Sequence, residues 1–131
     1  MWDPDLQLSL GNIALAQQRY TAMLLELIRS LLSGHPAPCI LDVGCGTGHI
    51  LQHLIEHGYQ ADAVNPSAHL NKLVRERLAA LQHRSTTLYE TAFESLPLEH
   101  CRHQYDLLLV SESFQYIPLP DIIAMATELL S

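Results

Sequence analysis

Hydrophobic residues in the first third of the chain recur at intervals of three and four. This spacing places them on one stripe and predicts an amphipathic helix. The stripe comprises Ile13, Ala16, Tyr20, Leu24, Leu27 and Leu31. Ser33 and Gly34 end the helix, and Pro36 and Pro38 prevent it from resuming. Residues 1–34 are therefore expected to form a helical segment that packs on the sheet predicted by the residues that follow.

Beyond residue 38 the pattern changes to short apolar runs that alternate with helical stripes. The expected strands are 39–43, 59–64, 86–90 and 105–110, and the expected helices are 48–57, 67–83 and 120 to the end of the chain. Gly58 terminates the first of these helices, and Ser67 can cap the second. The run 105–110 is apolar on both faces, which is typical of a central parallel strand.

Alternation of strands and helices predicts an α/β fold, a doubly wound and mostly parallel sheet of the Rossmann-like type. Residues 35–131 are assigned to it. In such sheets ligands bind at the carboxyl ends of the strands, beside the point where the strand order switches. Function is therefore expected after Val43, Val64, Glu90 and Val110.

Composition narrows the class of protein. The chain has 131 residues, 48% of them hydrophobic, and a net charge of −7. This predicts one globular domain and argues against a disordered chain, a membrane span or a general nucleic-acid binder. A basic cluster of Lys72, Arg75, Arg77 and Arg84 is interpreted as a solvated helix face. The absence of a basic leader and the three cysteines without a CxxC motif favour a cytoplasmic protein.

Three glycines at alternate positions, Gly44, Gly46 and Gly48, link the first strand of the sheet to a helix. Glycines allow a tight turn with positive φ and let a ligand approach bare backbone, while the helix directs its first amides at that ligand. A Walker A loop needs a lysine that is absent here. A dinucleotide fingerprint needs a third glycine where His49 stands.

The segment ILDVGCGTG, residues 40–48, resembles motif I of the class I S-adenosylmethionine-dependent methyltransferases. Residues 105–117 are similar to the fourth-strand segment of that family, and Leu96-Pro97 falls where the family often has Leu-Pro. The resemblance covers nearly everything from Cys39 to Ser131. It implies S-adenosylmethionine as cofactor, S-adenosylhomocysteine as product and a methyltransferase acting on a small molecule.

The resemblance also implies a set of cofactor-binding residues. These are Asp42, Gly44, Cys45, Gly46, Gly48, Asn65, Pro66, Ala92, Phe93 and Ser111. Asp42 is expected under the glycine turn, where it orients backbone or the methionine ammonium, and the glycines line the methionine and ribose. Cys45 occupies a position where the family often has a cysteine that takes no part in the reaction.

Two of these positions depart from the family pattern. Asn65 stands where an acid usually accepts hydrogen bonds from both ribose hydroxyls, and Ala92 stands where an acid commonly binds the adenine amino group. Pro66 is expected against adenine, and the backbone at Phe93 beside the ring edge. Replacing a charge-assisted pair by neutral bonds costs about 1–2 kcal/mol, roughly tenfold in affinity. The departures predict a weaker or differently arranged cofactor site.

The candidates for a base that activates the methyl acceptor are Glu112 and Tyr116, by position alone. Ser111, directly after the fourth strand, is expected to border the transferring methyl. Tyr116 replaces a histidine common in one subset of the family, so the chemistry of that subset is not carried over.

His49, His53 and His57 are spaced four apart, a step that can bring imidazoles onto one metal. The apolar face of the same helix carries Ile50 and Leu54, which leaves the histidines on the other side. The sequence therefore predicts a solvated face and no metal site.

Two other functions remain open at this point. One is a non-catalytic methyltransferase-like subunit that needs a partner, and the other is a nicotinamide-dependent oxidoreductase. Against the seven strands of the family sheet, four are expected here, in the spatial order third, second, first, fourth. The sheet is thus predicted to be truncated after the fourth strand and following helix, so this chain alone could be inactive. Its edge is expected to be covered by a homo-oligomer contact or a partner chain.

Overall fold

The computed structural model describes residues 6–83, 85–110 and 117–130, with side chains from residue 18 onward. The chain divides into two compact units, Met1–Gly34 and His35–Ser131. The first unit contains the 26-residue helix α1, Leu6–Leu31, which confirms the helix predicted from the apolar spacing. Gly34 follows it with a φ of 91°, a conformation that favours glycine and ends the helix.

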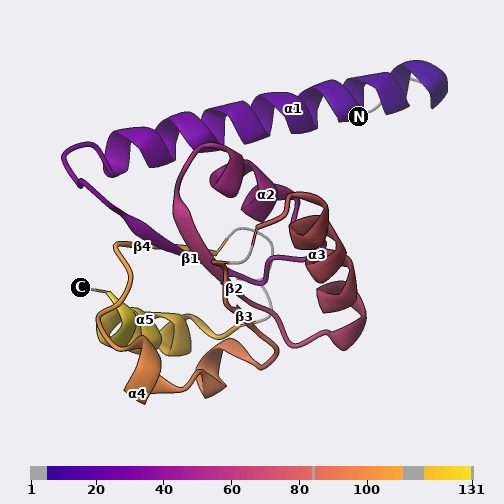
Figure 1. The fold of residues 1–131 in the computed structure, drawn as a ribbon. Helices are drawn as coiled ribbons and strands as arrows, with labels where there is room; N and C mark the ends of the chain where they lie inside the picture. The colour runs from indigo at the N-terminus through magenta and orange to yellow at the C-terminus, as the bar shows by residue number, and fades with distance from the viewer. Residues whose placement is uncertain (1–5, 84, 111–116, 131) are drawn as a thin grey trace. The chain divides into compact units, whose positions relative to one another are not determined.

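The second unit alternates strands and helices along the chain. Its elements are β1 (Cys39–Val43), α2 (His49–Glu56), β2 (Gln60–Val64), α3 (Ala68–Ala80), β3 (Leu88–Tyr89), the 3-10 turn η1 (Phe93–Ser95), α4 (Leu98–Cys101), β4 (Leu107–Leu109) and α5 (Leu119–Leu129). The four strands are parallel in the order β3-β2-β1-β4. Helices α2 and α3 cover one side of the sheet, and α4 and α5 cover the other (Figure 1). The predicted doubly wound fold and strand order are confirmed.

The centre of the sheet is the pair β1 and β2, which runs in register from Cys39 opposite Gln60 to Val43 opposite Val64. Most residues of this pair are buried, as expected for the central strands of a parallel sheet, and the exceptions are Cys39, Gln60 and Asp62. On the side of α4 and α5, buried residues of the pair join a continuous hydrophobic core. That core comprises Leu41, Val43, Val64, Phe93, Leu96, Cys101, Tyr105, Met125 and Leu129.

The hydroxyl of Ser67 accepts a 3.2 Å hydrogen bond from the amide of Leu70 and so caps α3, as predicted. Helix α3 ends at Ala80, three residues before the expected boundary. The third strand is shorter than predicted, because only Leu88 and Tyr89 pair with β2.

The segment before β4 contains a short helix that the alternation of strands and helices did not predict. This helix is α4, whose Cys101 is fully buried against the core. Tyr105 lies outside β4, where its hydroxyl donates a 2.7 Å hydrogen bond to Oδ2 of Asp62 on β2. The same residue forms an isolated parallel bridge with Leu130, so the backbone after α5 approaches the β4 side of the sheet. Association of another chain at this edge stays a prediction.

Within the described part of the chain, no helix combines the length and apolar character that a membrane span requires.

Candidate functional site

The loop between β1 and α2 is a tight glycine turn. Gly44, Gly46 and Gly48 have φ angles of 72°, 57° and 87°, the left-handed region in which a Cβ atom is strained. The amide of Gly44 donates a 2.8 Å hydrogen bond to the carbonyl of Val64, and the amide of Gly48 donates one of 2.9 Å to the carbonyl of Cys45. The alternate glycines are therefore needed for the turn itself.

Asn65 follows β2 and lies opposite this turn. It is 5% exposed, and its Nδ2 lies 3.5 Å from the carbonyl oxygen of Gly46, a long and weak hydrogen bond. Its backbone amide donates to Tyr89 of β3, and its carbonyl accepts a 2.9 Å hydrogen bond from Nδ2 of Asn71. Backbone and side-chain contacts thus fix Asn65 beside the glycine turn.

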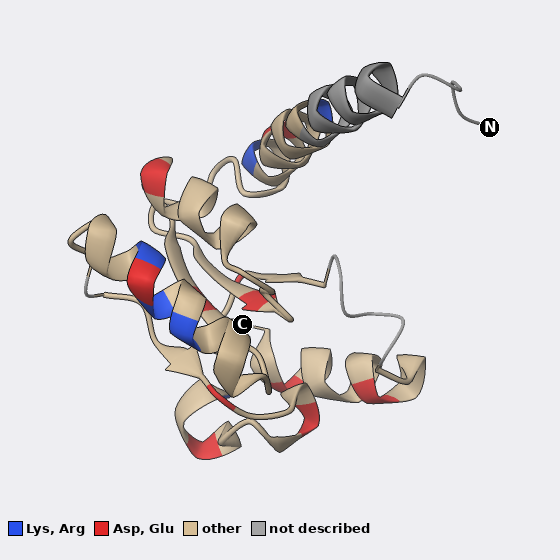
Figure 2. Ribbon diagram, turned by 90° about the vertical axis from the view of Figure 1, so that its right-hand side faces the viewer, with Lys and Arg blue, Asp and Glu red and all other residues tan. Residues whose placement is uncertain are grey.

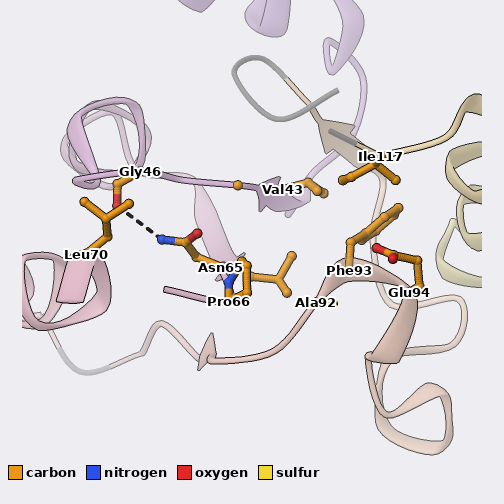
Figure 3. Close-up of a pocket in the computed structure, with 11 residues that line it drawn as sticks. Val43, Gly46, Asn65, Pro66, Leu70, Ala92, Phe93, Glu94 and Ile117 are labelled. Carbon is orange, nitrogen blue, oxygen red and sulfur yellow. Dashed lines mark hydrogen bonds between the residues drawn. The ribbon is translucent and has the colours of Figure 1, made fainter. Parts of the chain in front are cut away.

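A cavity of about 390 Å³ opens at the carboxyl ends of the parallel strands. Its walls come from the glycine turn, the end of β2, helix α3, the turn η1 and the start of the segment before α5 (Figure 3). The lining residues are Val43, Gly44, Gly46, Val64, Asn65, Pro66, Leu70, Ala92, Phe93, Glu94 and Ile117. The volume falls within the range of about 300–1,000 Å³ that small-molecule sites occupy.

Six of the ten expected cofactor-binding residues line this cavity. They are Gly44, Gly46, Asn65, Pro66, Ala92 and Phe93. They come from the ends of three different strands, as expected for a ligand at the switch point of a parallel sheet.

The other expected residues lie elsewhere. Asp42 and Cys45 are buried at the base of the turn, and neither lines the cavity. Gly48 begins α2 and packs on α3, because a Cβ atom there would lie 3.3 Å from Cγ2 of Val74. Ser111 and the two candidate bases, Glu112 and Tyr116, lie outside the described residues.

Leu70, Glu94 and Ile117 line the cavity although the sequence did not single them out. The sequence does indicate that Leu70 faces inward, because it begins the apolar stripe of α3. Glu94 carries the ionisable side chain among the described residues that line the cavity. It lies two residues beyond Ala92, on the turn η1, which the sequence pattern did not predict.

Three residues of the basic cluster lie on α3, which carries blue bands in Figure 2, and their surroundings differ; Arg84 lies outside the described residues. Lys72 and Arg75 are exposed, and Arg75 pairs with Glu90 at 3.2 Å. Arg77 instead turns towards the glycine turn and donates a 2.8 Å hydrogen bond from Nε to the carbonyl oxygen of Thr47. The sequence indicates this position in part, because Arg77 stands three residues after Val74 and therefore lies on the buried stripe of the helix.

Asn71 is a buried polar residue of α3 that the sequence did not indicate. It is fully buried, and its Nδ2 donates both to the carbonyl of Asn65 and to Oε1 of Glu90, at 2.9 and 3.3 Å. Helix α3 therefore contacts both the turn after β2 and the end of β3 through polar side chains.

The histidines of α2 lie one turn apart, with ring centroids 4.8 Å apart between His49 and His53 and 6.5 Å apart between His53 and His57. Partial burial and the neighbouring His49 lower the pKa of His53, and Glu56 opposes this effect. Among the described residues, no group of three or more histidine, cysteine or acidic side chains is arranged to hold a metal ion.

Two tyrosines with raised pKa do not line the cavity: Tyr105 belongs to the hydrophobic core, and Tyr89 is partly buried against it. Burial, and then the side chain of Cys101, raise the pKa of Tyr89 to about 12. Burial, and then Asp62, raise the pKa of Tyr105. Both hydroxyls therefore remain protonated at neutral pH, and Tyr105 is held as a hydrogen-bond donor to Asp62.

Comparison with known proteins identifies the class of this fold. Residues 40–131 match a family described as "Methyltransferase domain". Because the match covers most of the chain, the chain belongs to this family, and the resemblance to the class I S-adenosylmethionine-dependent methyltransferases is confirmed. S-adenosylmethionine is the cofactor that this family uses.

Individual relatives are distant. The chain is 33% identical over 73 residues to malonyl-[acyl-carrier protein] O-methyltransferase of Pectobacterium atrosepticum, which is 56% of this chain and 27% of that protein. It is 24% identical over 81 residues to an uncharacterized methyltransferase of Alkaliphilus oremlandii, 62% of this chain and 34% of that protein. The matches thus span about a third or less of the length of these curated relatives.

The fold is similar to that of geranyl diphosphate C-methyltransferase from Streptomyces coelicolor, in a crystal structure that also contains Mg²⁺, geranyl diphosphate and S-adenosyl-L-homocysteine. The TM-score is 0.76 at 18% identity, and the superposition covers 98% of this chain and 49% of the other. At this identity the likeness establishes the fold.

Proposed function

We propose that this chain binds S-adenosylmethionine in the cavity at the ends of β1, β2 and β3, as the cofactor of a methyl transfer to a small-molecule acceptor. One observation carries the proposal. Six residues that the family resemblance assigns to the cofactor come together around a single cavity, although they are spread from Gly44 to Phe93 in the sequence.

The chemistry of the cavity walls suits this ligand. Gly44 and Gly46 present bare backbone, so the methionine and ribose can approach without meeting a Cβ atom. Pro66, Ala92 and Phe93 offer apolar surface for a planar purine ring. The side-chain oxygen of Asn65, which lines the cavity, can accept one ribose hydrogen bond, whereas a carboxylate can accept two.

When bound, the cofactor supplies a methyl group on a sulfonium, which is the reactive electrophile. The contribution of the chain is alignment and exclusion of water by the walls described above. A base is needed only if the acceptor carries a proton at the reacting atom. Glu112 and Tyr116 follow β4 in the sequence and remain our candidates for that role.

Calorimetric titration of S-adenosylhomocysteine into the purified chain tests the proposal. We expect micromolar binding at one site and its loss in Gly46→Arg, because Gly46 lines the cavity. Gly58→Arg is the matched control: Gly58 also has a positive φ, of 86°, but it faces open space at the end of α2. No binding at millimolar ligand by a folded protein would contradict the proposal.

The same titration, together with melting temperatures measured with each ligand, separates the alternatives that the sequence left open. A non-catalytic subunit that does not bind the cofactor predicts no heat with S-adenosylhomocysteine. A nicotinamide-dependent oxidoreductase predicts that NAD or NADP, rather than S-adenosylhomocysteine, raises the melting temperature. Our proposal predicts the reverse ranking.

A further inference from the structure

Arg77 bonds two neighbouring segments that precede it by 25 and 30 residues, the helix α2 and the glycine turn. From α3, its Nε donates a 2.8 Å hydrogen bond to the carbonyl oxygen of Thr47 in the glycine turn. Its Nη1 donates a 2.7 Å hydrogen bond to Oε1 of Gln52 on α2. Both bonds come from a charged donor and are therefore stronger than bonds between neutral groups. One guanidinium thus ties the glycine turn to the helices on either side.

The aliphatic part of Arg77 also contacts the turn. A Cβ atom at Gly48 would lie 3.4 Å from Cδ of Arg77 and 3.3 Å from Cγ2 of Val74. Helix α3 therefore packs directly on the backbone of Gly48, and Arg77 contributes both surface and hydrogen bonds to this contact.

The turn needs such an external tie because of its composition. Glycine has access to many backbone conformations, and three of the five residues 44–48 are glycines. A ligand that binds one conformation has an apparent affinity reduced by the fraction of molecules already in it. A contact that raises this fraction improves binding without touching the ligand.

We propose that Arg77 is a positioning residue for the cofactor: it holds the carbonyl of Thr47 and thereby keeps the glycine turn in its binding conformation before the ligand arrives. This inference rests on the proposed function, because it presupposes that the cofactor binds against Gly44 and Gly46. Arg77 is not among the residues that line the cavity.

Three variants of the full chain test the inference. Arg77→Met keeps the aliphatic stem over Gly48 and removes both hydrogen bonds. Arg77→Lys restores one donor for Thr47. Lys72→Met removes the same charge from an exposed position on the same helix.

The dissociation constant of S-adenosylhomocysteine is measured at a temperature where all variants show the far-UV spectrum of the unsubstituted chain. We expect binding about tenfold weaker in Arg77→Met, from the loss of the charge-assisted bond to Thr47, which is the one that reaches the glycine turn. The affinity of Arg77→Lys is expected to lie between that of Arg77→Met and that of the unsubstituted chain. Lys72→Met is expected to bind like the unsubstituted chain. In nitrogen–proton correlation NMR spectra recorded without ligand, the backbone amide resonances of Gly46 and Gly48 should shift in Arg77→Met. They should not shift in Lys72→Met.

If Arg77 only stabilises the fold, Arg77→Met will have a lower melting temperature and an unchanged dissociation constant. That result would overturn the inference and leave the proposed function intact. Equal weakening by Lys72→Met would also overturn it, because the effect would then be one of net charge. If the unsubstituted chain does not bind S-adenosylhomocysteine, the proposed function itself fails and the role of Arg77 in cofactor binding fails with it.

Discussion

The two sides of the cavity are held in different ways. The first side, Gly44 and Gly46 with Asn65, is fixed by positive φ angles and by hydrogen bonds from β2 and α3. The second side, Ala92 and Phe93, is fixed by packing, since Phe93 is 3% exposed and belongs to the hydrophobic core. We call them the backbone wall and the core wall. The first should respond to changes in backbone freedom, and the second to changes in side-chain volume.

The largest effect is expected at the core wall. Phe93→Ala should lower the free energy of unfolding by about 3–5 kcal/mol, the cost of removing a buried aromatic ring and leaving a cavity. Urea unfolding measures this loss. Leu119→Ala is the control, because Leu119 is 66% exposed and should change the stability by less than about 0.5 kcal/mol. Similar losses in the two variants would show that the core wall is not held by packing.

Next in size is a change at Gly48, which follows the backbone wall in the sequence and packs on α3. Gly48→Ala combines a strained φ of 87° with contacts to Val74 and Arg77, and should cost about 2–3 kcal/mol. Gly58→Ala carries the same strain at 86° but meets no atom within 4 Å, so about 1 kcal/mol is expected. The difference between the two losses in the free energy of unfolding, measured with urea, reports the contribution of the contact between α3 and Gly48. Equal costs would contradict that contact.

The contrast between the walls also explains what the sequence could predict. The glycine spacing and the apolar run of β1 are local signals, and both the turn and the bounds Cys39–Val43 were predicted correctly. The cap at Ser67 is equally local. These features depend on residues that are neighbours in the chain.

The partners of contacts between distant residues had no such local signal. Arg77 bonds a backbone carbonyl thirty residues away, and Asn71 bonds Asn65 and Glu90 from inside an apolar stripe. The helical pattern places both side chains beside Val74, but it does not indicate which groups of other segments they bond. The helical turn α4 was missed for the same reason, because Cys101 is buried only by packing on the core.

A smaller effect is expected where the backbone wall departs from the family. Asn65→Asp should bind S-adenosylhomocysteine about tenfold more tightly, because a carboxylate accepts from both ribose hydroxyls with charge assistance. The contact that it loses, from Nδ2 to the carbonyl of Gly46, is 3.5 Å long and weak. Asn65→Ala should bind more weakly than either. Calorimetry checks this ranking of affinities. Weaker binding by Asn65→Asp would mean that the hydrogen bond from Nδ2 of Asn65 to Gly46 contributes more to binding than the additional ribose hydrogen bond does.

The smallest effect concerns pH, through the helix that follows the glycine turn. Burial, and then His49, lower the pKa of His53 below the ordinary value of 6.5, so the folded chain favours the neutral imidazole. The unfolded chain then binds the proton more readily, and stability is complete above about pH 6.5 and falls as the pH drops towards the folded pKa. The melting temperature should decline over this window, and less so in His53→Gln. An equal decline in both proteins would assign the effect to other groups.

The most direct test of the cofactor site locates the ligand on the chain. In nitrogen–proton spectra of the labelled protein titrated with S-adenosylhomocysteine, we predict shifts at the amides of Gly44, Gly46 and Asn65 on the backbone wall and of Phe93 on the core wall. The amide of Gly58, at the far end of α2, should stay in place. Shifts confined to other parts of the chain, or none at saturating ligand, would contradict a cofactor site between the two walls.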